Sequence, residues 1–183
     1  FGLPALLMRM KEDGRSKPLP ILGQAGIKTF VERLVNLAYP GAFKTLGFPV
    51  ESIEVSAKRE IRLGGHTLAF HATRHAITNL GLRLSFGEFS LFVSGDGELT
   101  EDSSRALLDS RFVVQECYQV QGNKPLHATF DAIHALVDAA QGPPERVFLV
   151  HPAREQRAAL EATVHARGLP YVVPRDLQMY DLD

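Results

Sequence analysis

Three side chains able to bind metal stand directly after apolar segments that have the length and composition of buried strands. Asp96 ends "SLFVSGD" between two glycines, Glu116 ends "FVVQE", and His151 follows "RVFLV". In open α/β sheets, ligands collect at the carboxyl ends of the strands, so these three positions can meet in space. Carboxylates and imidazoles that converge in this way are ligands for divalent metals such as zinc. The pattern therefore indicates a metal-dependent site.

Two further histidines could join this site. His75 lies in the connection between two β-like segments, within "RHAITNLGLRL". His127 lies at the start of a helix expected over 128–140, and Asp131 and His134 follow it at i+4 and i+7. That spacing can form a metal-binding face. Because the apolar stripe on the opposite face of the helix is complete, we expect Asp131 and His134 to be solvated, which leaves His127 as the functional candidate.

Each of these residues taken alone has a simpler interpretation. His75 can be a loop histidine without a functional role, and the glycines around Asp96 can mark a tight turn. His66 and His71, in a β-like segment, are expected to be structural or at the surface. The interpretation as a site therefore depends on several strand ends offering ligand side chains together.

The elements expected around the candidates alternate between strands and helices, without repeats. Strands are expected within 17–23, 50–56, 59–75, 80–96, 111–118, 146–151 and 171–173, and helices within 24–41, 100–109, 128–140 and 154–167. This order is an antiparallel β-meander that continues into βαβ-like units, an α/β fold with helices on the outer face of a sheet. No linker separates the elements, so we expect residues 1–183 to form one domain.

Composition narrows the class of protein. The 183 residues are 45% apolar and 22% charged, as in ordinary globular domains. A net charge of −1 with scattered Lys and Arg gives no electrostatic case for binding nucleic acid. The single cysteine, Cys117, excludes an internal disulfide and fits a reducing, cytoplasmic location. The sequence has no run of 18 apolar residues that could span a membrane.

Taken in order, the motifs resemble the metallo-β-lactamase superfamily and, within it, the ribonuclease Z-like, phosphodiesterase-type branch. The segments "GLPALL", a histidine before "GLRL", "GDG", "QE", "HAT" and "VH" follow one another as the branch's motifs do. The resemblance implies metal ligands at His75, Asp96 and His151, and a catalytic pair formed by His127 and Glu116.

The resemblance also implies a four-layer αββα sandwich, and the sequence departs from the family pattern at three points. The branch carries an H-x-H-x-D-H block with further metal ligands just before the "GLPALL" motif, so we expect the domain to be incomplete at its N-terminus. Gly97 stands where the family usually has a hydroxyl residue, and Gln115 stands where it has histidine.

The mechanism that the resemblance implies uses two divalent ions, usually zinc, with manganese or iron as alternatives. Ions about 3.5–4 Å apart would share the Asp96 carboxylate and turn a water into a hydroxide nucleophile. His127, polarised by Glu116, would protonate the leaving alkoxide, a contribution of about 10²–10⁴-fold.

We expect the substrate to be a small phosphodiester or a cyclic nucleotide, or another small ester-like compound, rather than tRNA. Ribonuclease Z enzymes that process the 3′ ends of tRNA usually carry a long basic arm, and no insertion of that kind occurs here. That endoribonuclease activity is one alternative, a lactonase or thioesterase of the same fold is a second, and a non-catalytic binding scaffold is a third. We also expect a homodimer.

Overall fold

The apolar segments that end in the candidate residues form neighbouring strands of one sheet. The computed structural model describes residues 2–122 and 124–182. Its larger sheet has seven strands in sequence order: β3 (Glu60–Leu63), β4 (His66–Thr73), β5 (Asn79–Phe86), β6 (Phe89–Val93), β7 (Phe112–Glu116), β8 (Arg146–Val150) and β9 (Tyr171–Val172). Strands β3 to β6 pair antiparallel, and β6 to β9 pair parallel. The expected meander leading into parallel strands is confirmed.

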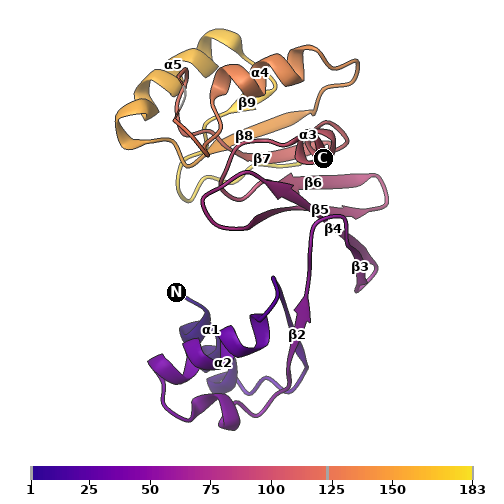
Figure 1. Cartoon of the computed structure of the whole chain (residues 1–183), viewed down its shortest axis with the longest axis vertical. Helices are drawn as coiled ribbons and strands as arrows, with labels where there is room; N and C mark the ends of the chain where they lie inside the picture. The colour runs from indigo at the N-terminus through magenta and orange to yellow at the C-terminus, as the bar shows by residue number, and fades with distance from the viewer. Residues whose placement is uncertain (1, 123, 183) are drawn as a thin grey trace. The chain divides into compact units, whose positions relative to one another are not determined.

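Three helices connect the parallel strands and pack on one face of the sheet. They are α3 (Glu101–Leu108), α4 (Phe130–Asp138) and α5 (Arg157–Arg167), the last preceded by the short 3-10 helix η2 (Arg154–Gln156). Figure 1 shows α4 and α5 on the same side of β7, β8 and β9. Val113 packs with Ile133 and Leu160 in the core between helices and sheet. Because side chains alternate along a strand, Glu116 points to the face opposite Val113.

The first 56 residues form a smaller unit. Its elements are α1 (Leu3–Glu12), β1 (Leu19–Gly23), α2 (Ile27–Ala38), the 3-10 helix η1 (Ala42–Thr45) and β2 (Val50–Glu54). Strands β1 and β2 pair parallel on either side of α2 in the sequence. Leu7 of α1 and Val31 and Val35 of α2 are fully buried in its core. The sequence did not lead us to expect α1, although Pro4 in its first turn is a favourable helix start.

The chain divides into two compact units, Phe1–Ser56 and Ala57–Asp183. All five candidate site residues lie in the second unit. The interpretation of 1–183 as a single domain stays a prediction. Within 2–122 and 124–182, no helix combines the length and the apolar character that crossing a membrane requires.

Candidate metal and catalytic site

The structure brings all five candidate residues to the same edge of the seven-stranded sheet. His75 lies between β4 and β5, Asp96 follows β6, Glu116 is the last residue of β7, and His151 directly follows β8. His151 Nδ1 lies 3.5 Å from Asp96 Oδ1. The ring of His127 has its centre 5.5 Å from that of His75 and 6.2 Å from that of His151. We call these residues the five-residue cluster.

Glu116 is the centre of the five-residue cluster. Its side chain is fully buried, and its Oε1 lies within hydrogen-bonding distance of Nδ1 of His127, with Nδ1 of His151 3.3 Å away. Its Oε2 accepts the backbone N–H of Gly97 at 2.5 Å and that of Ala128 at 3.4 Å. A buried carboxylate is tolerated only when it is hydrogen-bonded in this way. Glu116 thus ties together the segments that carry the other members of the cluster.

The two glycines beside Asp96 are required by the backbone. Gly95 has φ +64° and Gly97 has φ +119°, both in the region that favours glycine. A Cβ on Gly97 would lie 2.8 Å from the carbonyl oxygen of Arg74, closer than side chains approach backbone. The neighbouring backbone therefore accounts for a glycine where the family resemblance leads one to expect a hydroxyl residue.

Two non-glycine residues of the site region adopt left-handed backbone conformations. His151 has φ +59°, and Leu126, directly before His127, has φ +68°. Such conformations are costly for residues with a Cβ and are concentrated at functional sites.

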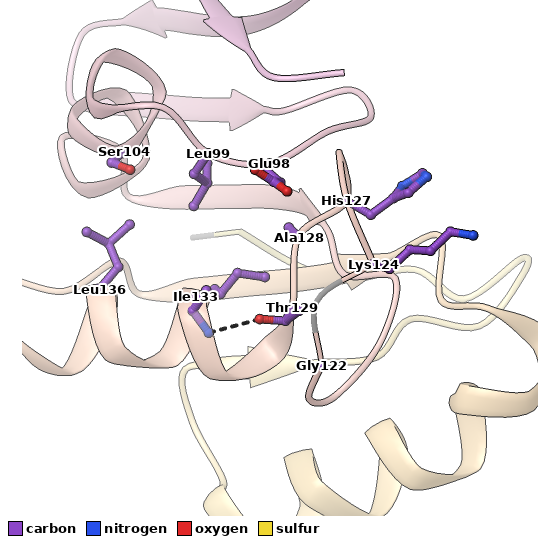
Figure 2. Close-up of a pocket in the computed structure, with 11 residues that line it drawn as sticks. Glu98, Leu99, Ser104, Gly122, Lys124, His127, Ala128, Thr129, Ile133 and Leu136 are labelled. Carbon is purple, nitrogen blue, oxygen red and sulfur yellow. Dashed lines mark hydrogen bonds between the residues drawn. The ribbon is translucent and has the colours of Figure 1, made fainter. Parts of the chain in front are cut away.

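His127 belongs to the loop before α4 and not to the helix itself. The sequence led us to expect a helix from about residue 128, but Thr129 has extended backbone angles and its Oγ1 accepts an N–H of the first turn at 3.2 Å (dashed line in Figure 2). Thr129 is thus the N-cap, and α4 begins after it.

Three other histidines have partners elsewhere. His71 Nδ1 lies 3.3 Å from a carboxylate oxygen of Asp102 in α3, and His66 contacts an aromatic ring of β5. His134 was expected to be solvated, but its Nδ1 lies 2.9 Å from the hydroxyl of Tyr171, which is nearly buried. The expectation failed because β9 lies next to α4, a long-range packing that helical periodicity does not reveal.

Two residues that contact the site were not found from the sequence. The ring of Tyr118 stacks on His127, with centres 4.5 Å apart. Glu98 pairs with Arg74 and accepts the backbone N–H of Leu126 at 2.8 Å. The hydrogen bond from Arg74 holds the pKa of the Glu98 carboxyl below its usual value. Tyr118 lies two residues beyond Glu116, which ends β7, and this position could have indicated it, whereas no local pattern marks Glu98.

A cavity of about 360 Å³ lies behind the loop that carries His127. Leu99, Ile133 and Leu136 line its apolar side, while His127 and Lys124 point away from these residues (Figure 2). The segment that carries His127 thus forms part of the wall of this cavity.

Two subsets of the five-residue cluster have the spacing of ligands to a divalent metal. Tetrahedral ligands about 2.0–2.2 Å from zinc lie about 3.3–3.6 Å from one another, and the Asp96 and His151 atoms are 3.5 Å apart. Ligand atoms of Glu116, His127 and His151 also lie within 4.8 Å of one another. Because Oε2 of Glu116 already accepts two backbone N–H groups, we interpret Glu116 as the hydrogen-bond partner of His127 and not as a metal ligand. The division into ligands (His75, Asp96, His151) and a catalytic pair stays a prediction.

Comparison with known proteins gives one partial sequence match and a shared fold. Ribonuclease Z of Staphylococcus aureus is 35% identical over 85 residues, which is 46% of this chain and 26% of that protein, so the chain spans about a quarter of the curated relative's length. The metallo-β-lactamase fold protein YhfI of Bacillus subtilis aligns with a TM-score of 0.62 at 19% identity, covering 88% of this chain and 64% of that one. Zinc-bound PqqB of Methylobacterium extorquens aligns with a TM-score of 0.69 at 18% identity, covering 99% and 66%. No family profile matches the chain. The two structural likenesses confirm the expected fold class.

Proposed function

We propose that the chain is part of a metal-dependent hydrolase of the metallo-β-lactamase type that cleaves a small phosphodiester or a cyclic nucleotide. The shared fold and the partial match to a ribonuclease Z support this proposal. One observation carries the proposal. A histidine oriented by a buried glutamate, His127 with Glu116, lies beside a carboxylate–imidazole pair at metal-ligand spacing, Asp96 with His151. A proton donor beside ligands for a Lewis acid is what hydrolysis of a phosphate ester requires.

Within this proposal, His75, Asp96 and His151 would hold zinc, with manganese or iron as alternatives. The donor set of two imidazoles and a carboxylate suits these ions. Bound divalent ions supply a water-derived nucleophile at neutral pH and neutralise charge that develops on the phosphoryl oxygens.

Residues of this chain orient His127, which donates the proton to the leaving group. Glu116 engages Nδ1 of His127, which leaves Nε2 to carry the transferable proton. Tyr118 stacks against the ring and limits its rotation. In the reaction, a water that has released a proton to solvent bonds through its oxygen to phosphorus. The bond from phosphorus to the leaving alcohol oxygen breaks, and that oxygen takes the proton from His127. The imidazole then regains a proton from solvent.

A second candidate function is ribonuclease activity. It is favoured by the 35% identity with a ribonuclease Z over 85 residues. The chain's net charge of −1 disfavours it, because binding a polyanion draws most of its affinity from cationic side chains. Cleavage of tRNA precursors by the protein, with weak activity on small diesters, would select this second candidate.

The proposal is tested by replacing His127 with Ala and comparing two leaving groups. On a diester with an alkyl leaving group, kcat should fall by about 10²–10⁴-fold, the value of one general acid. On a nitrophenyl diester kcat should change much less, because nitrophenolate leaves without a proton. His66→Ala is the matched control, since His66 lies at the start of β4 and contacts an aromatic ring outside the five-residue cluster.

Metal content measured on the same preparations completes the test. His127→Ala should bind as much metal as the unaltered protein. Loss of metal, or an equal loss of kcat on both diesters, would show that His127 is a ligand or a structural residue. Hydrolysis of a lactone or thioester in place of both diesters would point to the corresponding branch of the fold. Binding of metal without hydrolysis of any of these compounds would favour the scaffold.

A further inference from the structure

Arg74 and Glu98 join two of the segments that form the site. Their backbones pair in both directions, with Arg74 N donating to Glu98 O at 2.9 Å and Glu98 N donating to Arg74 O at 3.0 Å. Their side chains form an ion pair, with Arg74 Nε 2.6 Å from Glu98 Oε2. Arg74 directly precedes His75, and Glu98 follows Asp96 by two residues, so this pair fixes two candidate metal ligands relative to each other.

Glu98 also reaches a third segment. Its Oε1 accepts the backbone N–H of Leu126 at 2.8 Å. Leu126 has the left-handed φ of +68° and directly precedes His127. After His127, the backbone is held by Tyr118 N, which donates to Ala128 O at 3.0 Å. On its other side, this segment borders the cavity of about 360 Å³. The contact with Glu98 therefore holds the backbone at Leu126, next to the cavity that Glu98 and His127 both line.

We propose that Glu98 is a positioning residue for His127, with Arg74 orienting its carboxylate. Among the described residues, the side-chain hydrogen bonds of Glu98 go to Arg74 and Leu126, so we assign its effect on His127 to the backbone of Leu126. A hydrogen bond to a charged acceptor is stronger than one between neutral groups, which suits it to hold a strained residue in place. The catalytic consequence rests on the proposed function, whereas the structural role does not.

A second ion pair in the chain, at the surface, serves as the matched control for Arg74 and Glu98. Arg111 and Glu145 form a two-pronged side-chain pair at 2.6 and 3.1 Å, and Glu145 N donates to Arg111 O. Exposed pairs of this kind contribute little to stability. Glu145→Ala thus removes an equivalent ion pair that has no contact with the loop of His127.

The structural role is tested by amide hydrogen exchange, which needs no substrate and no metal. In the unaltered protein, the Leu126 amide should be protected. Glu98→Ala should speed its exchange by at least about tenfold, while Glu145→Ala leaves it unchanged. Glu98→Gln keeps an oxygen that can accept this N–H, so its exchange rate should lie closer to that of the unaltered protein. Equal exchange of Leu126 in Glu98→Ala and in the unaltered protein would overturn the proposal.

The catalytic consequence is read from kcat on the two diesters. Since a displacement of about 1 Å can cost about 100-fold, Glu98→Ala should lower kcat by up to about 100-fold on the alkyl diester. The loss should be much smaller on the nitrophenyl diester, KM should change little, and Glu98→Gln should recover most of the rate. Equal losses on both diesters would overturn the role of Glu98 in placing the proton donor. Absence of hydrolysis in the unaltered protein, with the exchange result intact, would refute only the proposed function.

Discussion

Replacing Gly97 with Ala should lower the free energy of unfolding more than the same change at a glycine with nearly the same φ. Gly97→Ala forces a residue with a Cβ to keep φ +119°, a strain of about 1–3 kcal/mol. The new Cβ would also lie 2.8 Å from the Arg74 carbonyl oxygen and 3.1 Å from Thr73 Oγ1, and overpacking of this kind costs about 1–3 kcal/mol. The free energy of unfolding should therefore fall by about 2–6 kcal/mol.

Gly122→Ala is the control, because Gly122 has φ +121°. There the new Cβ meets Gln119 Nε2, the end of a flexible side chain that can move away, so only the strain of about 1–3 kcal/mol is expected. Urea unfolding monitored by circular dichroism measures both changes. Zinc affinity should also fall in Gly97→Ala, since the N–H of Gly97 binds Glu116 and Asp96 precedes it. Equal destabilisation by the two changes would refute the close approach of the Arg74 backbone.

Two further predictions follow from buried ionisable groups. Burial, with the nearby Glu116 carboxylate, raises the pKa of the Cys117 thiol to about 12. At pH 8, iodoacetamide should therefore modify this thiol at least about 100-fold more slowly in the folded protein than in the urea-unfolded protein. Similar rates in the two states would contradict the burial of Cys117. Burial also raises the pKa of Tyr171 from 10.0 to about 12, so its contribution to stability is fully present below pH 10 and is lost as the pH rises toward 12. Absorbance titration should show one of the four tyrosines ionising last, and Tyr171→Phe should abolish that step.

The strands and their ends could be predicted because the signals are local. Apolar segments such as "RVFLV" and "FVVQE" have the length of single strands, and parallel strands bring their carboxyl ends to one edge. Those two facts predict that Asp96, Glu116 and His151 lie together, and in the structure His151 lies 3.5 Å from Asp96 and 3.3 Å from Glu116. The motif order then added His75 and His127, which the structure also places at this edge.

The contacts between segments could not be predicted in the same way. Glu98 meets Leu126 across 28 residues of sequence, and nothing in "GDGELT" marks it as a backbone acceptor. The partner of His134 lies 37 residues away in β9. The helix α1 was not expected from the sequence either, although Pro4 in its first turn is a local signal for a helix start.

Zinc binding by the protein and by a variant with the predicted ligands removed tests the proposed site most directly. The variant combines His75→Ala, Asp96→Asn and His151→Ala, and zinc is measured by elemental analysis after dialysis. The unaltered protein should retain zinc in stoichiometric amount, His127→Ala should retain the same amount, and the triple variant should retain none while keeping its circular dichroism spectrum. Equal zinc in the unaltered protein and the folded triple variant, or none in either, would contradict a metal centre at this edge of the sheet.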